Sequence, residues 1–342
     1  AGSPEEPVGL KVEAVEETLW EVSVAGSPEL AARRKEPGET SKAVARKMPR
    51  HLLQDGEVYY GLLNREGRKE GYGVSLARDG ERYEGAFRAG SRHGDGCMTS
   101  ERMSLQGSWV DGEFREGRAV RPKEWVYEGT FGAGLTFEGR GRLAMGGEGG
   151  EGGELYDGEF KAGVREGKGK AIYPDGTIYE GDWTRGRKEG RGVETKEGSR
   201  YEGTWMRDLY HGEGTLTIPG EGLEYKGAFK GGVYDGHGAL ETRGGKRVEG
   251  RFKNGNLADG RALVFYEHGD KFSGHIKDGK PEGEGTMKYK TGDVYVGHFK
   301  EGRREGQGTC VFKGGEEFTG RWVEDKMGEG VLKGDGFEHV YE

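Results

Sequence analysis

The chain has 342 residues, of which 70 are glycine; only 32% are apolar, whereas 33% are charged. Its net charge is −8, and acidic and basic residues are interleaved, unlike the one-sided basic surface of a nucleic-acid-binding protein. The two cysteines, Cys97 and Cys310, lie far apart and no apolar run approaches the length of a membrane-spanning helix, which excludes a disulfide framework, a CxxC zinc site and a transmembrane helix.

The first 56 residues differ from the rest and are predicted to form an N-terminal arm. Apolar residues near residue 20 alternate, as on one face of a strand, and a polar linker follows at residues 27–40. The segment from Ser41 to Leu53 has helical spacing and is basic. It predicts a short helix packed on the structure that follows or, alternatively, a helix that binds a partner or a membrane surface. The predicted partner-binding residues of the arm are Trp20, Val22, Val24, Lys42, Arg46, Lys47 and Arg50.

From residue 57 onward one phrase recurs at intervals of 22 to 29 residues. Its clearest copy is YEGDWTRGRKEGRG, from Tyr179 to Gly192. An aromatic residue stands at position 0, Gly at +2, Phe or Trp at +4, Gly or Asp near +7, and a Gly-x-Gly pair near +11 and +13. A fixed period in this range is the signature of a repeat array. Copies start at Tyr59, Tyr83, Leu105, Tyr127, Tyr156, Tyr179, Tyr201, Tyr225, Val248, Phe272, Tyr295 and Phe318.

Each copy has the period of a β-strand followed by a turn. Positions 0, +2 and +4 lie on one face of an extended chain, whereas the alternate positions, such as Glu180 and Asp182, are polar. Glycine near +7 predicts a tight turn, and a second turn such as Asp175-Gly176 ends the copy, so each copy predicts one β-hairpin. Glycine inside a strand permits close approach by another group. We therefore expect the aromatic rings of adjacent hairpins to lie over these glycines.

The copies resemble the MORN (membrane occupation and recognition nexus) repeat over roughly residues 57–333. The resemblance implies an all-β fold: an elongated, single-layer, twisted antiparallel sheet of about twelve tandem hairpins. The arm at residues 1–56 precedes the array, and residues 334–342, where aromatic residues alternate, are predicted to cap it. The predicted repeat core comprises Tyr83, Gly85, Phe87, Tyr156, Gly158, Phe160, Tyr179, Gly181, Trp183, Tyr201, Gly203, Trp205, Tyr225, Gly227, Phe229, Tyr295, Gly297 and Phe299.

Several copies depart from the pattern. Leu105, Val248 and Phe272 replace tyrosine, and the third copy lacks a clear glycine pair. Residues 139–153 are predicted to be a Gly-Glu loop inserted in the fourth copy, and the GxGxxG within it lacks the strand and helix of a dinucleotide site. The segment from Gly274 to Pro281 resembles a phosphate-binding loop but ends in proline where serine or threonine is required.

Basic pairs recur in the predicted turns, each followed directly by a glutamate. The favoured interpretation is a solvated turn, and contact with anionic lipid headgroups is the alternative. The histidines do not cluster as ligands, and no catalytic residue, cofactor or metal site is predicted. The basic pairs are Arg68-Lys69, Arg187-Lys188 and Arg303-Arg304.

The repeats use nearly the whole chain and leave no room for a catalytic domain. The sequence therefore predicts a non-catalytic scaffold or structural subunit of a larger protein assembly, with protein partners and no nucleic acid. A peripheral membrane protein that binds anionic phospholipids is the alternative, and an enzyme with a site between repeats is a third hypothesis. The resemblance implies a cytoplasmic, cytoskeletal or ciliary, membrane-adjacent location. The chain starts at Ala1 rather than at methionine, so a plastid or mitochondrial protein after removal of a presequence stays open.

Overall fold

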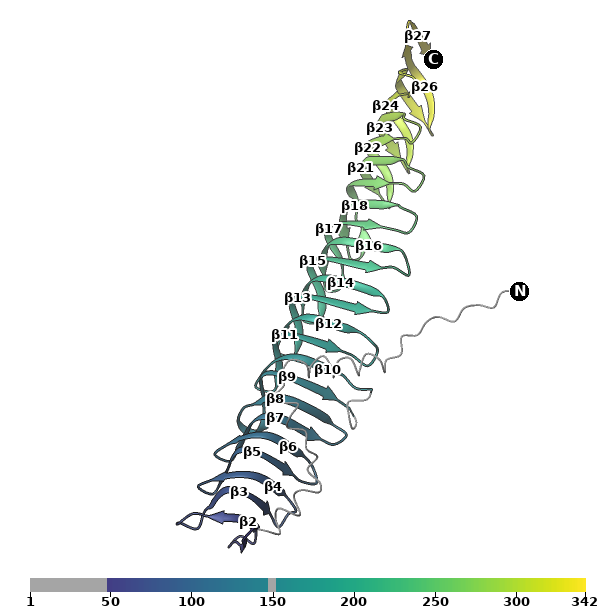
Figure 1. The fold of residues 1–342 in the computed structure, drawn as a ribbon. Coiled ribbons are helices and arrows are strands. Elements are labelled where there is room, and N and C mark those ends of the chain that lie inside the picture. The colour runs from purple at the N-terminus through teal and green to yellow at the C-terminus, as the bar shows by residue number, and fades with distance from the viewer. Residues whose placement is uncertain (1–47, 147–151) are drawn as a thin grey trace, which may run out of the picture. The chain divides into compact units, whose positions relative to one another are not determined.

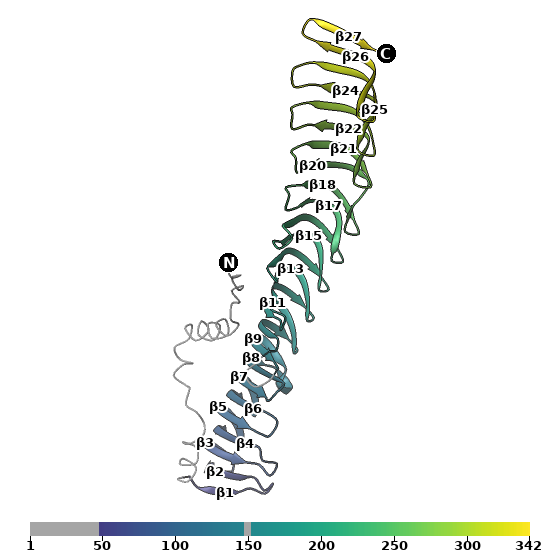
Figure 2. The ribbon, with the colours of Figure 1, turned by 90° about the vertical axis from the view of Figure 1, so that its right-hand side faces the viewer.

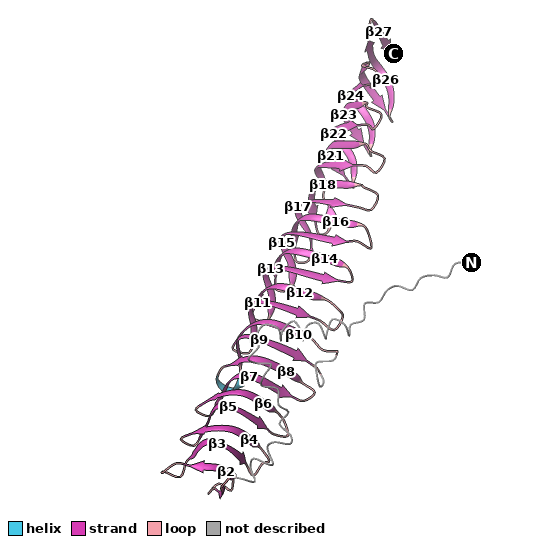
Figure 3. Ribbon diagram, viewed as in Figure 1, coloured by secondary structure: helices cyan, strands magenta, loops and turns pink. Residues whose placement is uncertain are grey.

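The computed structural model describes residues 48–146 and 152–342, in two units that meet in sequence between Met98 and Thr99 (Figure 1). Nearly all of the described chain is antiparallel strand joined by short turns, with one short 3-10 helix at Ala133–Leu135 (Figure 3). The predicted fold class, an all-β antiparallel sheet of tandem hairpins, is confirmed.

The first unit contains β1 (Arg50–Leu52), β2 (Val58–Leu63), β3 (Lys69–Leu76), β4 (Arg82–Arg88) and β5 (Ser91–Thr99). Strand β1 pairs with β2, β2 with β3 and β3 with β4, all antiparallel.

Residues Arg50–Leu52 form a strand, so the helix predicted from Ser41 to Leu53 is wrong over its last residues. Arg50 lies opposite Tyr60, and the Gly61 N–H donates to the Pro49 carbonyl at 3.0 Å. The reason is that the edge of β2 offers unpaired backbone groups, which a strand satisfies and a helix does not. The other residues predicted to bind a partner lie outside the described residues: Trp20, Val22, Val24, Lys42, Arg46 and Lys47.

The second unit is a run of strands in which each pairs with the next along the chain (Figure 2). One strand pair is interrupted, because β18 pairs first with the two-residue β19 and then with β20. The strands are β6 (Ser104–Val110), β7 (Glu113–Arg121), β8 (Trp125–Phe131), β9 (Phe137–Met145), β10 (Leu155–Lys161), β11 (Val164–Ile172), β12 (Ile178–Thr184), β13 (Arg187–Lys196), β14 (Ser199–Met206), β15 (Leu209–Ile218), β16 (Leu223–Lys230), β17 (Val233–Glu241), β18 (Arg247–Lys253), β19 (Asn256–Leu257), β20 (Gly260–Phe265), β21 (Lys271–Lys277), β22 (Lys280–Lys288), β23 (Val294–Lys300), β24 (Arg303–Val311), β25 (Glu317–Val323), β26 (Lys326–Gly334) and β27 (Phe337–Tyr341).

Each regular hairpin closes through a two-residue turn. In the β12–β13 turn, Arg185 has φ 50° and Gly186 has φ 78°. Two successive positive φ values define the type I′ turn, whose twist matches that of the flanking strands. The glycine or aspartate at +7 is therefore required by the left-handed backbone there.

Glycines lie opposite one another on successive strands and form a row across the sheet. Gly181 faces Gly169 on one side and Gly192 on the other. The third copy contributes Gly117, which pairs with Gly107, although the sequence showed no clear glycine pair there. In the second unit the row runs through Gly107, Gly117, Gly129, Gly141, Gly158, Gly169, Gly181, Gly192, Gly203, Gly214, Gly227, Gly238 and Gly250, passes Ala262, and continues through Gly274, Gly285, Gly297, Gly308, Gly320 and Gly330.

The tyrosine at position 0 lies over this glycine row. A β-carbon at Gly192 would come within 2.5 Å of the Tyr179 ring, and one at Gly181 would lie 2.5 Å from its hydroxyl oxygen. The ring thus covers the two glycines of its own hairpin, not those of an adjacent hairpin as expected from the sequence. The residue at +4 makes the contact between hairpins, because Trp205 packs edge-on against Tyr179 with ring centroids 5.0 Å apart.

Tyrosine rather than phenylalanine stands at position 0 in most copies because its hydroxyl has a partner. The Tyr201 hydroxyl donates to the Thr204 carbonyl at 2.8 Å, and Tyr179 donates to Asp182 in the same way at 2.9 Å. That carbonyl lies beside the β-bulge that follows the +2 glycine. The aromatic core residues predicted from the sequence are all buried: Tyr83, Phe87, Tyr156, Phe160, Tyr179, Trp183, Tyr201, Trp205, Tyr225, Phe229, Tyr295 and Phe299.

The loop predicted at residues 139–153 is wrong over its first half. Strand β9 extends to Met145, and its Gly141 takes a place in the glycine row opposite Gly158. The extra residues of this copy are instead divided between a longer hairpin loop, which contains the 3-10 helix, and the connection after β9. Residues 147–151 of that connection lie outside the described residues.

Candidate functional site

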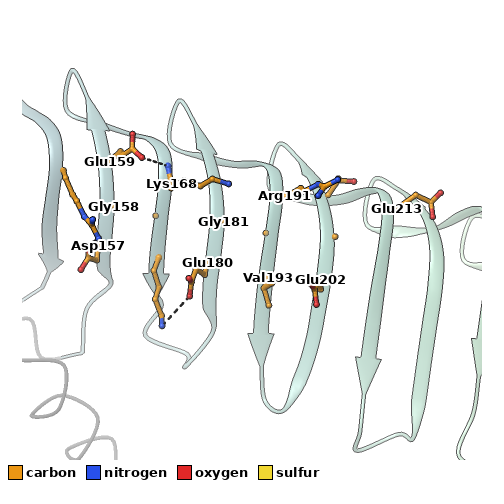
Figure 4. A pocket seen from close by; sticks show the side chains of 16 residues that line it. Asp157, Gly158, Glu159, Lys168, Glu180, Gly181, Arg191, Val193, Glu202 and Glu213 are labelled. Carbon is orange, nitrogen blue, oxygen red and sulfur yellow. Dashed lines mark hydrogen bonds and ion pairs between the residues drawn. The ribbon is translucent and has the colours of Figure 1, made fainter. Parts of the chain in front are cut away.

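The face of the second unit opposite the aromatic rings is polar, and two rows of its side chains flank the glycine row. Row A lies on the side of position 0 and includes Lys170, Glu180, Val193 and Glu202, which face one another on successive strands. Row B lies on the other side and includes Lys168 opposite Asp182, and Arg191 opposite Thr204. Figure 4 shows the two rows as parallel lines of side chains on neighbouring strands.

Two hollows lie on this polar face. The first hollow has a volume of about 810 Å³ and spans strands β9 to β15 between Arg140 and Glu213. The second hollow has a volume of about 900 Å³ and spans strands β17 to β25 between His237 and Thr319. Glycines of the row form the floor of both, so each is open along the sheet rather than closed by side chains.

Charges in the first hollow are largely neutralised across the strands. From Arg142 to Glu180 row A alternates in sign, with an ion pair between Arg142 and Asp157 at 2.7 Å and another between Lys170 and Glu180 at 3.7 Å. In row B, Lys168 pairs with Asp182. Burial opposes ionisation of Asp182, but its hydrogen bonds from Lys168 and from the Arg191 backbone outweigh burial and lower the pKa of its carboxyl.

The second hollow has a different chemistry. Its row A is uncharged from β20 to β25 and includes Leu263 and Val296, which are 40% and 55% exposed. Its row B is rich in histidine and contains one acid among its cations. The facing pairs are His237 with Arg251, Arg261 with His275, Glu284 with His298, and Gln307 with Arg321. The row A residues of the second hollow from β20 onward are Leu263, Ser273, Thr286, Val296, Thr309 and Thr319.

The second basic residue of each predicted basic pair is covered, so the prediction of a solvated turn is wrong for Lys69, Lys188 and Arg304. Their side chains are only 14%, 11% and 19% exposed. Each lies beside the aromatic face and pairs with an acid: Lys69 with Glu57, Lys188 with Glu194 and Arg304 with Asp325.

The cations also contact the rings of two hairpins. Lys188 Nζ lies 4.9 Å from the ring centroids of both Tyr179 and Trp205, and the Arg304 guanidinium lies 4.1 Å from that of Trp322. Such cation–π contacts are stronger when the cation is desolvated. The residue at this position therefore holds neighbouring hairpins together. The sequence contained a signal for these enclosed cations. The second residue of each basic pair falls near +9, on the same strand as the glycine pair.

The glutamate after each basic pair joins one repeat to the next. Glu189 accepts a hydrogen bond at 3.0 Å from the Arg207 backbone N–H, in the turn of the next hairpin. Glu305 accepts likewise from Glu324 at 3.0 Å. These N–H groups belong to residues with positive φ, so the carboxylate satisfies a turn donor that has no strand partner.

The described residues provide no obvious reaction centre. Within residues 48–146 and 152–342, no three His, Cys, Asp or Glu side chains gather as metal ligands, and no helix is long and apolar enough to cross a membrane. Burial raises the pKa of the thiols of Cys97 and Cys310, which disfavours the reactive thiolate. The segment from Gly274 to Pro281 forms parts of β21 and β22 and the turn between them.

Nine segments of the chain match the MORN repeat: residues 65–82, 83–101, 156–178, 179–198, 201–221, 225–246, 272–294, 295–317 and 318–336. The chain belongs to the MORN repeat family. The copies that start at Leu105, Tyr127 and Val248 are not among the matched segments, yet each starts in a strand of the sheet. MORN hairpins in this chain thus persist where the aromatic or glycine signal has weakened, as at Leu105 and Val248, and where residues are inserted, as after Tyr127.

No curated protein matches the sequence of this MORN protein. Among solved structures it is similar to the SAS-4 (dCPAP) TCP domain of Drosophila melanogaster in complex with a proline-rich motif of Ana2, with 13% identity over 46% of this chain and 84% of that chain, and a TM-score of 0.31. It is also similar to the TCP10 domain of Danio rerio CPAP, with 12% identity over 74% of this chain and 94% of that chain, and a TM-score of 0.21. These similarities are too low to bear on function.

Proposed function

We propose that this MORN protein is a non-catalytic scaffold or structural subunit that binds partner proteins on the polar face of its sheet. The observation that carries the proposal is the pair of open hollows on that face. They present uncharged, hydroxyl and charged side chains over many strands. Repeat arrays commonly use such extended surfaces for binding.

The opposite face supports the proposal by exclusion. There the tyrosines and the +4 aromatic residues are buried, and cations such as Lys188 cover the rings. Little of that face can gain further burial from a partner. The polar face keeps exposed apolar groups, such as Val296, that a partner can cover.

Binding to anionic phospholipid is the alternative. The basic pairs were its motivation, and in each pair the second cation is already engaged by an acid and by aromatic rings. One exposed cation per pair remains, such as Arg187, and an isolated cation near a charged membrane contributes only about 1 kcal/mol. We therefore favour protein partners over anionic phospholipid. A cytoplasmic location near the cytoskeleton, the cilium or a membrane is part of the same proposal.

The test is affinity purification of the tagged full chain from its native cells. We expect Leu263→Glu/Val296→Glu to reduce recovery of specific co-purifying proteins at least about tenfold, because a buried unpaired charge disfavours an interface. We expect the same reduction for Lys170→Glu/Glu180→Lys, because each position then presents the opposite charge to the partner. The control is Lys246→Glu in an exposed turn, which should leave recovery unchanged. Unchanged recovery with both face variants, or flotation of the wild-type chain on anionic vesicles without any protein partner, would contradict the proposal.

A further inference from the structure

Strands β9 to β12, which line the first hollow, alternate in charge from one strand to the next (Figure 4). On each strand the two residues beside the central glycine carry the same sign, so rows A and B alternate together. Although cross-strand pairs form within the sheet, Arg140, Lys168 and Glu180 keep 84%, 73% and 70% of their side chains exposed. The four segments are Arg140-Gly141-Arg142 in β9, Asp157-Gly158-Glu159 in β10, Lys168-Gly169-Lys170 in β11 and Glu180-Gly181-Asp182 in β12.

This charge pattern is complementary to a second copy of itself. A two-fold axis parallel to the strands, placed between β10 and β11, sets β10 of one copy against β11 of the other, and β9 against β12. Row A then faces row A, and every positive pair faces a negative pair. An axis through a strand would instead bring like charges together, which disfavours association. The two-fold arrangement uses the same surface of both chains, as closed dimers do.

The match extends to two further strands on either side. In row A, Arg118 of β7 faces Glu202 of β14 across the same axis, which is again an opposite pair. The remaining facing positions join a charged residue to an uncharged one, so no like charges meet in rows A and B of these strands. They are Glu128 with Val193 in row A, and Thr130 with Arg191 and Glu116 with Thr204 in row B.

An apolar row lies on the same face, beside row A and away from the glycines. It comprises Ala144, Leu155, Ile172 and Ile178, which face one another on β9 to β12. Ile178 is 36% exposed, and the other three are partly exposed. The same axis sets Leu155 against Ile172 of the second copy, and Ala144 against Ile178. Burial of these groups adds affinity, and the charges set the register.

We propose that the chain forms a two-fold symmetric dimer in which strands β9 to β12 of two copies pack face to face across the first hollow. Sheets that pack in this way lie about 10 Å apart, and the glycine row leaves room for the long charged side chains of both copies. With about 4.8 Å between strands and about 3.3 Å per residue, β7 to β14 cover roughly 650 Å² of each copy from the apolar row to row B. Each partner in a specific interface buries about 800 Å², which is a similar area.

The test exchanges charges so that one chain can no longer face its own copy. The β9–β10 variant is Arg140→Glu/Arg142→Glu/Asp157→Lys/Glu159→Lys, and the β11–β12 variant is Lys168→Glu/Lys170→Glu/Glu180→Lys/Asp182→Lys. Each keeps the net charge and sets like charges against each other across the axis. In sedimentation of the purified full chain, we expect a wild-type dimer and at least about tenfold weaker dimerisation of each variant alone.

An equal mixture of the two variants should dimerise again, because every exchanged strand of one then faces an opposite charge of the other. Both variants also place like charges side by side on β10 and β11 of one sheet, and mixing leaves that defect in place. Recovery on mixing therefore comes only from contact between copies. The matched control, Arg261→Glu/Glu284→Lys, exchanges charges in the second hollow without a change in net charge and should leave the dimer unchanged.

Circular dichroism checks that the variants are folded. If the four-site variants unfold, Arg142→Glu/Asp157→Lys mixed with Lys170→Glu/Glu180→Lys repeats the test with two changes per chain. A wild-type chain that is monomeric up to about 100 µM, variants that dimerise like the wild type, or folded variants that stay monomeric when mixed would overturn the proposal. The inference goes beyond the proposed function, because the purified chain alone tests it. A monomeric wild type that still recovers other proteins would leave the proposed function standing.

Discussion

The hairpin that starts at Tyr201 and the hairpin that starts at Val248 show what the glycine row is for. A β-carbon at Gly203 would lie 2.5 Å from the Tyr201 hydroxyl oxygen and 2.6 Å from the α-carbon of Gly214. No real side chain tolerates such contacts without a shift of the backbone. In this hairpin the ring occupies the space that a side chain on either glycine would need.

Val248 has no ring to place over the glycine row, and the row accommodates a side chain there. Ala262 takes the place of a glycine, and a β-carbon at Gly250 would lie 3.1 Å from Leu257 Cδ1, 3.3 Å from Ala262 Cβ and 3.7 Å from the Arg261 carbonyl oxygen. Leu257 fills the space left by the ring, and the second half of this hairpin is divided into β19 and β20. In the Tyr201 hairpin the ring and the backbone of the partner strand both exclude a side chain from Gly203, whereas no atom lies within 3.0 Å of a β-carbon at Gly250.

The comparison predicts its largest effect at alkaline pH, where the phenols ionise. Burial raises the pKa of Tyr201 and Tyr225 to about 12. Since an exposed tyrosine has a pKa of about 10, the folded state favours the neutral phenol. This stabilisation is complete below about pH 10 and is lost as the pH rises towards 12. The urea midpoint should therefore be steady near neutral pH and fall steeply above pH 10, with tyrosinate absorbance rising in step.

Two measurements sharpen this prediction. Hydrogen exchange at pH 10–11, referred to intrinsic rates, should show that β14 and β15 lose protection before β18 and β20, because Val248 has no phenol. Tyr201→Phe should cost about 1 kcal/mol at neutral pH through the lost hydrogen bond to Thr204. The variant should then lose less stability than the wild type between pH 10 and 12. Parallel pH curves for the two proteins would show that Tyr201 does not titrate with unfolding.

The second prediction compares glycine-to-alanine substitutions at matched positions of the two hairpins. Gly203→Ala should lower the free energy of unfolding by about 1–3 kcal/mol, because the methyl group collides with the Tyr201 ring and with backbone. Gly250→Ala should change it by less than about 0.5 kcal/mol, since no atom lies within 3.0 Å of the added methyl group and the nearest, Leu257 Cδ1 at 3.1 Å, belongs to a side chain that can move. Urea titration of both variants gives the comparison. Equal losses would mean that the strand, not the ring, requires glycine.

The third and smallest effect concerns position +9, which is Lys188 in a ring-bearing hairpin and Leu257 in the Val248 hairpin. Lys188→Ala should cost about 1–2 kcal/mol, because it removes a cation from two rings and leaves Glu194 without its ion pair. Arg187→Ala should cost less than about 0.5 kcal/mol, since that side chain is exposed. Thermal melting near pH 7 measures both, and a larger loss for Arg187 would reverse the assignment.

The repeats were predictable because their signals are local. Alternation at Tyr179, Gly181 and Trp183 places three residues on one face of any extended chain, and the glycine at +7 suits a tight turn wherever it occurs. The same logic located the weak copy at Val248, since the register of neighbouring copies constrains it. It failed at residues 139–145 because a run of glycine suggested a loop, whereas pairing with β10 holds these residues in a strand.

The two hollows could not be predicted in the same way. His275 and His298 lie in row B of the polar face, but which charges remain without partners depends on the residues that face them on the next strand. Arg261 faces His275, whereas Lys168 faces Asp182. The period of the repeat brings such pairs together from residues more than ten positions apart, so no local pattern shows them.

The sequence by itself determined the hairpins, their order and the face on which the aromatic residues lie, because side-chain alternation and turn chemistry act between neighbours along the chain. Only the tertiary structure decided which glycines a ring covers, that Lys69, Lys188 and Arg304 are enclosed, and that Arg251, Arg261 and Arg321 lack an acidic partner among the described residues. The physical reason is that these properties arise from contacts through space between strands. Burial and charge pairing depend on the residues of the neighbouring strands, and not on the next residues along the chain.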